Sequence, residues 1–140
     1  MLQALETPAR ILVADERPVS AMRLETTLIS AGFRQVRSTT DVREVSPLYE
    51  KWPFGLLILD MHARAGDGVS VLRQLDPALR RGDLVALALV DGRADGLARR
   101  ALDAGAAGVM TRSAEGCEAL TLVRETWAAF REAALSRRPS

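Results

Sequence analysis

A short aliphatic run that ends on a carboxylate is the strongest constraint on how this chain can fold. Residues 56–60 read Leu-Leu-Ile-Leu-Asp and directly follow Gly55. An apolar run of this length, bounded by a glycine and a charge, is typical of a strand that is buried on both faces. Such strands belong to parallel sheets covered by helices, and ligands of these sheets collect outside the carboxyl ends of the strands. Asp60 is therefore predicted to lie at the mouth of a site.

A second strand repeats this arrangement near the start of the chain. Residues 10–14 read Arg-Ile-Leu-Val-Ala, a short run that is apolar after its first residue and is followed at once by Asp15 and Glu16. If the two strands are neighbours, three carboxylates meet at one edge of the sheet. Crowded carboxylates share protons or bind a cation, and an all-oxygen set of ligands suits Mg²⁺. An aspartate beside such a cation can attack phosphorus. The residues alone also allow a second interpretation, in which the three acids only mark strand ends or cap helices.

Strand-like and helix-like segments alternate along the whole chain. Strands are expected at 10–14, 35–39, 55–60, 84–90 and 108–111, and helices at 18–31, 41–51, 68–75, 94–104 and 115–134. Five strand-then-helix units imply right-handed crossovers and a parallel sheet with helices on both faces. We expect one domain over residues 1–135 with its core at 10–134, and disorder only in the first few residues and in a tail at 136–140. The buried face of the helix at 18–31 is expected to consist of Met22, Leu24, Leu28 and Ile29.

Composition excludes several classes of function. The 140 residues include 19 basic and 18 acidic ones, so the net charge of +1 indicates neither a nucleic-acid partner nor a membrane surface. No window reaches the ~18 consecutive apolar residues of a membrane span, and the N-terminus does not look like a signal peptide. The single cysteine, Cys117, has no partner for an internal disulfide or a metal site. A cytoplasmic protein is expected.

Four motifs make the chain resemble the receiver domains of bacterial two-component response regulators over residues 10–134. They start at Ile11, Leu57, Asp67 and Ala101 and read Ile-Leu-Val-Ala-Asp-Glu-Arg-Pro, Leu-Ile-Leu-Asp-Met-His, Asp-Gly-Val-Ser-Val-Leu and Ala-Leu-Asp-Ala-Gly-Ala. The resemblance implies a flavodoxin-like α/β fold, a three-layer sandwich whose parallel five-stranded sheet has the order 2-1-3-4-5. It also implies a signalling role and no enzymatic activity. Residues 37–41 look similar to receivers that precede cyclic-dinucleotide phosphodiesterase or kinase modules.

The same resemblance implies roles for the acidic residues. Asp60 corresponds to the phosphoacceptor, which takes its phosphoryl group from a sensor histidine kinase or a phosphotransfer protein. The ligands of Mg²⁺ correspond to Asp15, Glu16, Asp60 and the backbone carbonyl of His62. The side chain of His62 would face the entrance of the site, where the family tunes hydrolysis of the phosphoryl group. The alternative for His62 is a loop residue with no such role.

The chain departs from the family pattern where phosphorylation is normally sensed. Val90 replaces the usual Thr or Ser hydroxyl, and Asp91 puts bulk and negative charge at the next position, which is usually small. Arg112 replaces the lysine, and its contact with the acceptor need not survive the change of shape. Val109 replaces the aromatic switch residue. These degenerate positions predict a receiver whose site geometry persists while its conformational readout is weak.

Two versions of the signalling role remain open. In the first, Asp60 is a phosphoacceptor in a phosphorelay and the domain is regulated through protein contacts. In the second, the chain is a phosphorylation-independent pseudo-receiver that acts as a protein-interaction or dimerisation module. A homodimer would use the segments at 94–104, 108–111 and 115–134, and neither nucleic acid nor a membrane is expected as a partner.

Two other classes of function fit the residues less well. An aspartate-nucleophile phosphatase needs a second aspartate where this chain has His62. A flavodoxin-like binder of small ligands needs a glycine-rich phosphate loop after the first strand, and the chain has Asp-Glu-Arg-Pro there.

Overall fold

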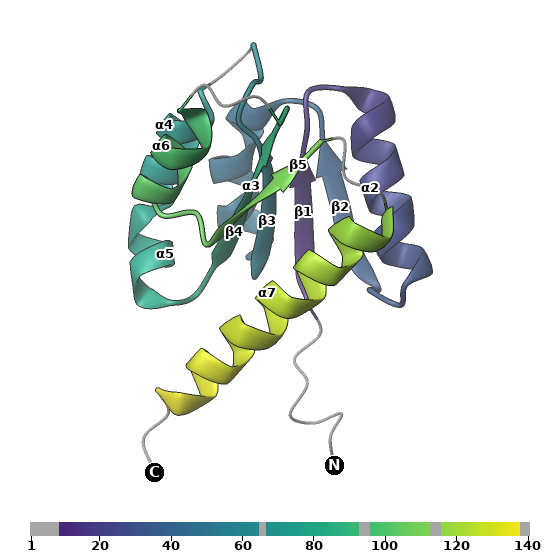
Figure 1. Ribbon diagram of the computed structural model, residues 1–140. Coiled ribbons are helices and arrows are strands. Elements are labelled where there is room, and N and C mark those ends of the chain that lie inside the picture. Colours follow the sequence, from purple (N-terminus) through teal and green to yellow (C-terminus); the bar gives the residue numbers. More distant parts are fainter. Residues whose placement is uncertain (1–8, 65–66, 93–95, 113–115, 138–140) are drawn as a thin grey trace.

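Five parallel strands form one sheet with helices on both faces in the computed structural model of the chain (Figure 1). The structure describes residues 9–64, 67–92, 96–112 and 116–137. The strands are β1 (Arg10–Ala14), β2 (Gln35–Thr39), β3 (Leu56–Asp60), β4 (Val85–Val90) and β5 (Gly108–Thr111). Their order in the sheet is β2-β1-β3-β4-β5. The predicted flavodoxin-like α/β fold and its strand order are confirmed.

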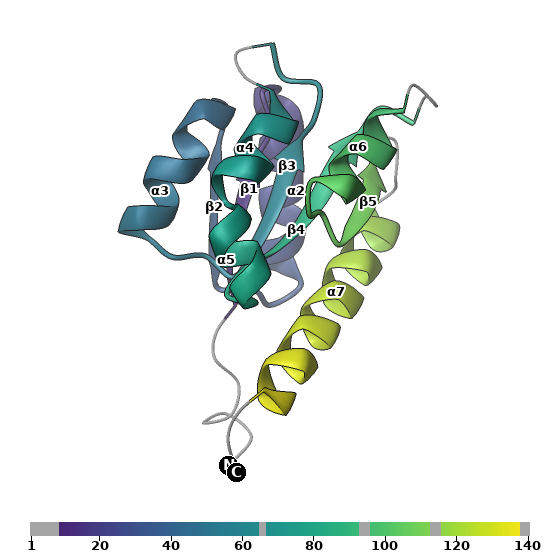
Figure 2. The same cartoon turned by 90° about the vertical axis from the view of Figure 1, so that its left-hand side faces the viewer.

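The two faces of the sheet are covered by different helices (Figures 1 and 2). One face carries α2 (Pro18–Ser30) and α7 (Gly116–Ser136). The other carries the 3₁₀ turn η1 (Val42–Glu44), α3 (Val45–Lys51), α4 (Gly68–Gln74), α5 (Asp76–Arg81) and α6 (Leu97–Asp103). Along β3, Leu57 and Leu59 belong to the core under α4, whereas Leu56 and Ile58 belong to the core under α2 and α7. Because successive side chains point to opposite faces and both faces are covered, β3 is apolar at every position before Asp60.

Residues 41–51 form two short elements instead of the single predicted helix. Asp41 precedes η1, and its side chain accepts a hydrogen bond from the amide of Arg43. The α-helix starts only at Val45, which places Pro47 in the first turn of α3. Proline is tolerated there because the first amides of a helix have no partner within it.

The helix α5 was not predicted from the sequence. It covers six residues and contains one buried side chain, Ala78, so it shows no apolar periodicity. The signal that marks it is Pro77 near its start, a position where proline is favoured.

The predicted buried face of α2 is wrong at two positions. Met22 and Ile29 are 63% and 50% exposed, while Ala21 and Leu28 are buried. Leu24 packs against the core beside Leu28. Residues 21, 24 and 28 share one helix face by the usual spacing of three and four, and this is the face that the sheet covers.

The last helix continues further than predicted. Ser136, expected to begin a disordered tail, is the final residue of α7. The predictions of disorder in the first few residues and at 138–140 lie outside the described residues. The same holds for the expected helix residues Ala94 and Glu115, so α6 and α7 are described from Leu97 and Gly116 onward. None of the helices that the structure describes is both long and apolar enough to cross a membrane.

Candidate functional site

Two of the three predicted carboxylates meet at the carboxyl edge of the sheet. Because β1 pairs with β3 in the register Ala14↔Leu59, Asp15 and Asp60 come next on adjacent strands. Both are buried, with exposed fractions of 0% and 2%. Burying two ionised carboxylates is costly unless each has a cation or hydrogen-bond donors. The partners of this pair therefore determine what the site can do.

Arg112 supplies the positive charge. It directly follows β5, and its side chain is only 12% exposed. Nη1 donates to Oδ1 and Oδ2 of Asp15 at 2.8 and 2.7 Å, and Nη2 lies 2.9 Å from Oδ1 of Asp60. Nε donates to Oδ1 of Asp91 at 3.0 Å, and Nη1 also donates to the hydroxyl of Ser20 at 3.0 Å. One guanidinium thus contacts three carboxylates.

The ionisation of these groups follows from the same contacts. Burial alone would raise the pKa of Asp15, but hydrogen bonds from Arg112, Ser20 and the amide of Arg17 together bring that pKa below its usual value. The hydrogen bond from Arg112 likewise lowers the pKa of Asp91, against a smaller opposing effect of burial. Burial disfavours the charged form of Arg112, yet its hydrogen bonds to Asp15 and Asp91 raise its pKa above the ordinary value. Asp15, Asp91 and Arg112 are therefore charged at neutral pH.

Backbone amides occupy the remaining acceptor positions of Asp60. The amide of His62 donates to Oδ1 at 2.8 Å, and the amide of Glu16 donates to Oδ2 at 3.2 Å. The carboxylate of Glu16 accepts a hydrogen bond from the amide of Arg64. Both oxygens of Asp60 are thus engaged by donors, as are both oxygens of Asp15.

This arrangement fits a guanidinium and does not fit Mg²⁺. Receiver domains typically bind Mg²⁺ through carboxylate oxygens, and here the oxygens of Asp15 and Asp60 face the Arg112 side chain instead. Among the described residues, no group of three or more histidine, cysteine, aspartate or glutamate side chains is arranged to hold a metal ion. Ligation of Mg²⁺ by Asp15, Glu16, Asp60 and the carbonyl of His62 stays a prediction.

The degenerate positions predicted from the sequence surround this network. The sequence left open whether Arg112 contacts Asp60. In the structure its guanidinium contacts both Asp60 and Asp15. Asp91, expected to add bulk and negative charge here, is paired with Arg112 and lies 3.9 Å from Arg17. The amide of Asp91 also donates to Nε2 of His62 at 3.1 Å, so that ring links the loop after β3 to the loop after β4.

The remaining predicted positions offer no polar contact to the site. Val90 is buried at the end of β4, and Val109 packs against the core on the α6 side of the sheet. Ser20 is the one member of the network that the sequence did not indicate. Its position in the first turn of α2, close after the Asp-Glu pair, is the only signal that could have suggested it.

Three comparisons place this geometry among known proteins. Residues 11–124 match the family model of the response regulator receiver domain. No curated protein matches the chain. A probable two-component system response regulator/GGDEF domain protein shares 24% identity and a TM-score of 0.81, over 87% of this chain and 50% of that one. The chain thus spans about half the length of that protein.

Two further solved structures are similar over nearly the whole of their own chains. The CheY-like receiver domain protein from Methanospirillum hungatei shares 18% identity and a TM-score of 0.81, over 91% of this chain and 99% of that one. The chemotaxis protein CheY4 from Vibrio cholerae shares 18% identity and a TM-score of 0.77, over 86% and 99%. At this level of identity the likeness shows the fold.

Proposed function

Because this chain belongs to the response regulator receiver domain family, we propose that it serves two-component signalling through protein contacts and without phosphorylation. Receiver domains are regulatory modules rather than enzymes. The observation that carries the proposal is the position of Arg112, whose guanidinium contacts Asp15, Asp60 and Asp91 at 2.7–3.0 Å. The guanidinium is a built-in cation that offsets part of the negative charge of the acidic site, so the buried carboxylates have a cationic partner without a metal or a phosphoryl group.

The charge balance supports this proposal. A phosphoryl group adds about −1.5 to −2 charges at neutral pH. On Oδ1 of Asp60 it would compete with Arg112 and the amide of His62, and on Oδ2 with the amide of Glu16. Val90 offers no donor in return. A modification signals only if two conformations differ in their contacts with it, and Val90 lacks the hydroxyl that senses phosphorylation in the family pattern.

Phosphotransfer from acetyl phosphate tests the proposal. The wild-type protein is incubated with acetyl phosphate and Mg²⁺, and its intact mass is followed over time. Asp60→Asn serves as the control for modification at other residues. We expect the wild type and Asp60→Asn to stay unmodified. A phosphoryl adduct on the wild type that Asp60→Asn lacks would contradict the proposal.

The second candidate function is a phosphorelay receiver with Asp60 as the phosphoacceptor. Its support is the place of Asp60 at the end of β3, with the amides of Glu16 and His62 orienting its carboxylate. The donor would be a sensor histidine kinase or a phosphotransfer protein. Mg²⁺ on Asp15, Glu16, Asp60 and the carbonyl of His62 would require Arg112 to withdraw. An adduct in the acetyl phosphate experiment would favour this candidate.

For either candidate we propose α6, β5 and α7 as the contact surface, in the cytoplasm, for a partner protein or a second copy. Leu102 is a large apolar residue on α6 that is 43% exposed, and Arg99 lies one helical turn before it.

Sedimentation of wild type and Leu102→Asp over a range of concentrations tests the homodimer. We expect a concentration-dependent dimer that the substitution weakens; a wild type that stays monomeric would exclude it. Neither nucleic acid nor a membrane is proposed as a partner.

A further inference from the structure

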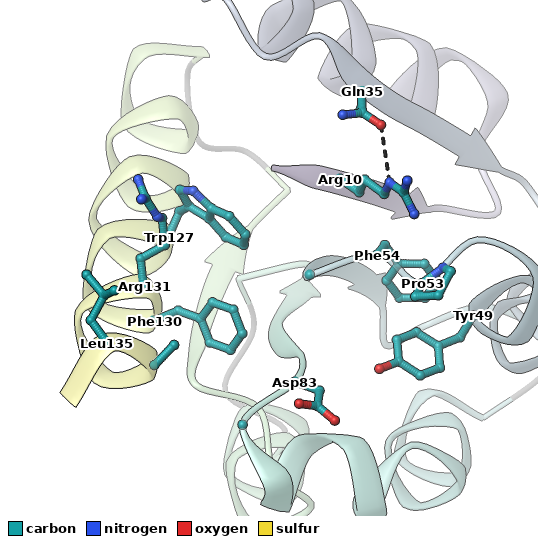
Figure 3. A pocket seen from close by; sticks show the side chains of 13 residues that line it. Arg10, Gln35, Tyr49, Pro53, Phe54, Asp83, Trp127, Phe130, Arg131 and Leu135 are labelled. Carbon is teal, nitrogen blue, oxygen red and sulfur yellow. Dashed lines mark hydrogen bonds between the residues drawn. The ribbon is translucent and has the colours of Figure 1, made fainter. Parts of the chain in front are cut away.

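A groove of about 680 Å³ lies at the amino edge of the sheet, opposite the acidic site (Figure 3). Residues at or just before the starts of four strands line it, namely Arg10, Gln35, Gly55 and Asp83. Its other walls come from the segment after α3 and from α7. Its volume falls in the range of small-molecule sites, which are mostly apolar and carry a few polar groups.

One wall is the part of α7 that continues past the family match. That match ends at residue 124, and the wall consists of Trp127, Phe130, Arg131, Ala134 and Leu135. In Figure 1 this half of the helix extends beyond the edge of the sheet. The ring of Trp127 lies so close to Gly55 that a Cβ there would be 2.9 Å from two ring carbons. At the end of α7, Nη2 of Arg137 donates to the carbonyl of Gly82 at 3.0 Å. Both ends of the wall are thus attached to the sheet edge.

Aromatic rings face each other across the groove. Figure 3 shows Trp127 and Phe130 on one side and Phe54 and Tyr49 on the other. The ring centroids of Trp127 and Phe130 are 5.4 Å apart. Those of Tyr49 and Phe54, which pack edge to face, are 5.1 Å apart. Such contacts fix the orientation of each ring. Phe54 is only 1% exposed, so Tyr49 is the ring that a ligand can contact on that side, with Phe54 packed behind it. Trp127 and Phe130 opposite Tyr49, with open space between them, suit a flat apolar ring as a ligand.

The charges at the groove favour an acid. Nε of Arg10 donates to Gln35 at 3.2 Å, and within the described part of the chain no hydrogen bond or ion pair reaches the two terminal nitrogens of Arg10. Asp83, at another side of the groove, already forms an ion pair with Arg81 at 2.9 Å. The planar fork of an arginine matches a carboxylate or a similar acid group. The charge that the groove can still bind is therefore negative.

We propose that this groove is a binding site for a small planar aromatic acid. The ring lies between the Trp127–Phe130 pair and Tyr49, and the acid group contacts the terminal nitrogens of Arg10. The site is independent of the Arg112 network, which lies at the opposite ends of the strands. Its ligand would give the domain an input that does not pass through Asp60.

Fluorescence titration with 8-anilinonaphthalene-1-sulfonate, an aromatic anion, tests the site. N-phenyl-1-naphthylamine has the same rings without the charge and serves as the neutral comparison. We expect saturable one-to-one binding of the anion, and weaker binding of the neutral probe. Arg10→Gln should remove the preference for the anion. Arg37→Gln is the matched control. The guanidinium groups of Arg10 and Arg37 both lie over the Trp52 ring, but only Arg10 lines the groove.

A second pair of variants tests the location. Ala134 lines the groove, whereas its neighbour Ala133 is exposed and does not. Filling the groove with Ala134→Leu should weaken binding of the anion by about tenfold, equivalent to about 1.4 kcal/mol. Ala133→Leu should leave it unchanged, and circular dichroism verifies that both variants fold.

Three results would overturn the proposal. The first is no binding of the anion by the wild type, and the second is equal binding by the two leucine variants. The third is a wild-type dimer in sedimentation that Ala134→Leu dissociates, because a second copy would then occupy the groove. Equal affinity for both probes, unchanged in Arg10→Gln, would overturn the choice of an acid.

Discussion

The two edges of the sheet treat their charges in opposite ways. At the carboxyl edge, Asp15 and Asp60 are buried and accept hydrogen bonds from Arg112 and from backbone amides. At the amino edge, Arg10 is half-buried and uses only one of its nitrogens in a described hydrogen bond. The carboxyl edge is closed and holds its own cation among the carboxylates, whereas the amino edge is open, aromatic and cationic.

This difference implies that the carboxyl edge contributes mainly to stability and the amino edge mainly to binding. A buried charged network contributes to the fold only when all of its members are present, because an orphaned member is expensive. An open groove whose arginine keeps two terminal nitrogens without a described hydrogen bond costs little in stability, and a ligand can bind those nitrogens. We therefore expect the loss of a charged side chain to lower the free energy of unfolding more at the carboxyl edge than at the amino edge, where it should change binding more than stability.

The largest effect is expected from Arg112→Ala. The substitution leaves Asp15 and Asp60 buried without a cation, which should lower the free energy of unfolding by about 3–5 kcal/mol. Urea denaturation followed by circular dichroism measures this change. Arg99→Ala is the control, since Arg99 forms an exposed pair with Asp103 and its loss should cost at most about 0.5 kcal/mol. Equal losses in the two variants would mean that the network does not stabilise the fold.

The sequence was sufficient for most of the fold because the strands are buried on both faces. The runs at β3 and β4 are continuously apolar, and both are fully buried. The helix α5 escaped prediction because a six-residue element with one buried side chain leaves no periodic pattern. Met22 and Ile29 were misplaced because apolar residues on α2 fall on more than one face, and only the packed structure selects between them.

The site was predictable in part for a similar physical reason. Asp15 and Asp60 meet because their strands are neighbours, which the topology fixes. The reach of Arg112 depends on the length and rotamer of a side chain that is 97 positions away from Asp15. No sequence pattern encodes that geometry. The aromatic groove likewise depends on the direction in which α7 leaves the sheet, since Trp127 and Phe130 of that helix form one of its walls.

The next largest effect is expected at the amino edge from Gly55→Ala. The added methyl group would lie 2.9 Å from two carbons of the Trp127 ring, so the ring or the strand must move, at a cost of about 1–3 kcal/mol. Thermal unfolding measures the cost. Gly116→Ala is the control, because the nearest atom to its new Cβ is a Thr27 methyl at 3.8 Å, and its effect should stay within about 0.5 kcal/mol. If Gly55→Ala lowered the free energy of unfolding as much as Arg112→Ala, the two edges would not differ in their contribution to stability.

A smaller effect depends on pH. The pKa of Asp91 is lowered in the folded protein by its hydrogen bond from Arg112, so this pair stabilises the fold above about pH 4, where unfolded aspartate is ionised. The contribution is lost as the pH falls through the lower folded pKa. Asp91→Asn should therefore be less stable than wild type by about 1 kcal/mol at pH 7, because the side chain is about one-third exposed.

The difference between the two proteins should vanish in acid. Urea denaturation at a series of pH values from 7 to about 3 would show the two free energies of unfolding converging below about pH 4. Asp103→Asn, in the exposed pair with Arg99, should differ from wild type by only a few tenths of a kcal/mol at pH 7. A difference between Asp91→Asn and wild type that persists at low pH would show that the ionised pair is not its source.

The smallest effect on stability is expected from Arg137→Ala. The substitution removes the hydrogen bond from Arg137 to the carbonyl of Gly82. Because this bond is exposed to solvent, the free energy of unfolding should fall by about 0.5 kcal/mol or less. The local effect on the end of α7 should be larger. This bond attaches that end to the turn before β4, and the Arg137 side chain forms no other described hydrogen bond or ion pair there. Amide hydrogen exchange should accelerate at residues 131–136 and stay unchanged at 119–123, where Ala119 and Val123 are buried against the sheet. Unchanged exchange at 131–136 would mean that the packing of Trp127 and Phe130 alone holds the helix over the groove.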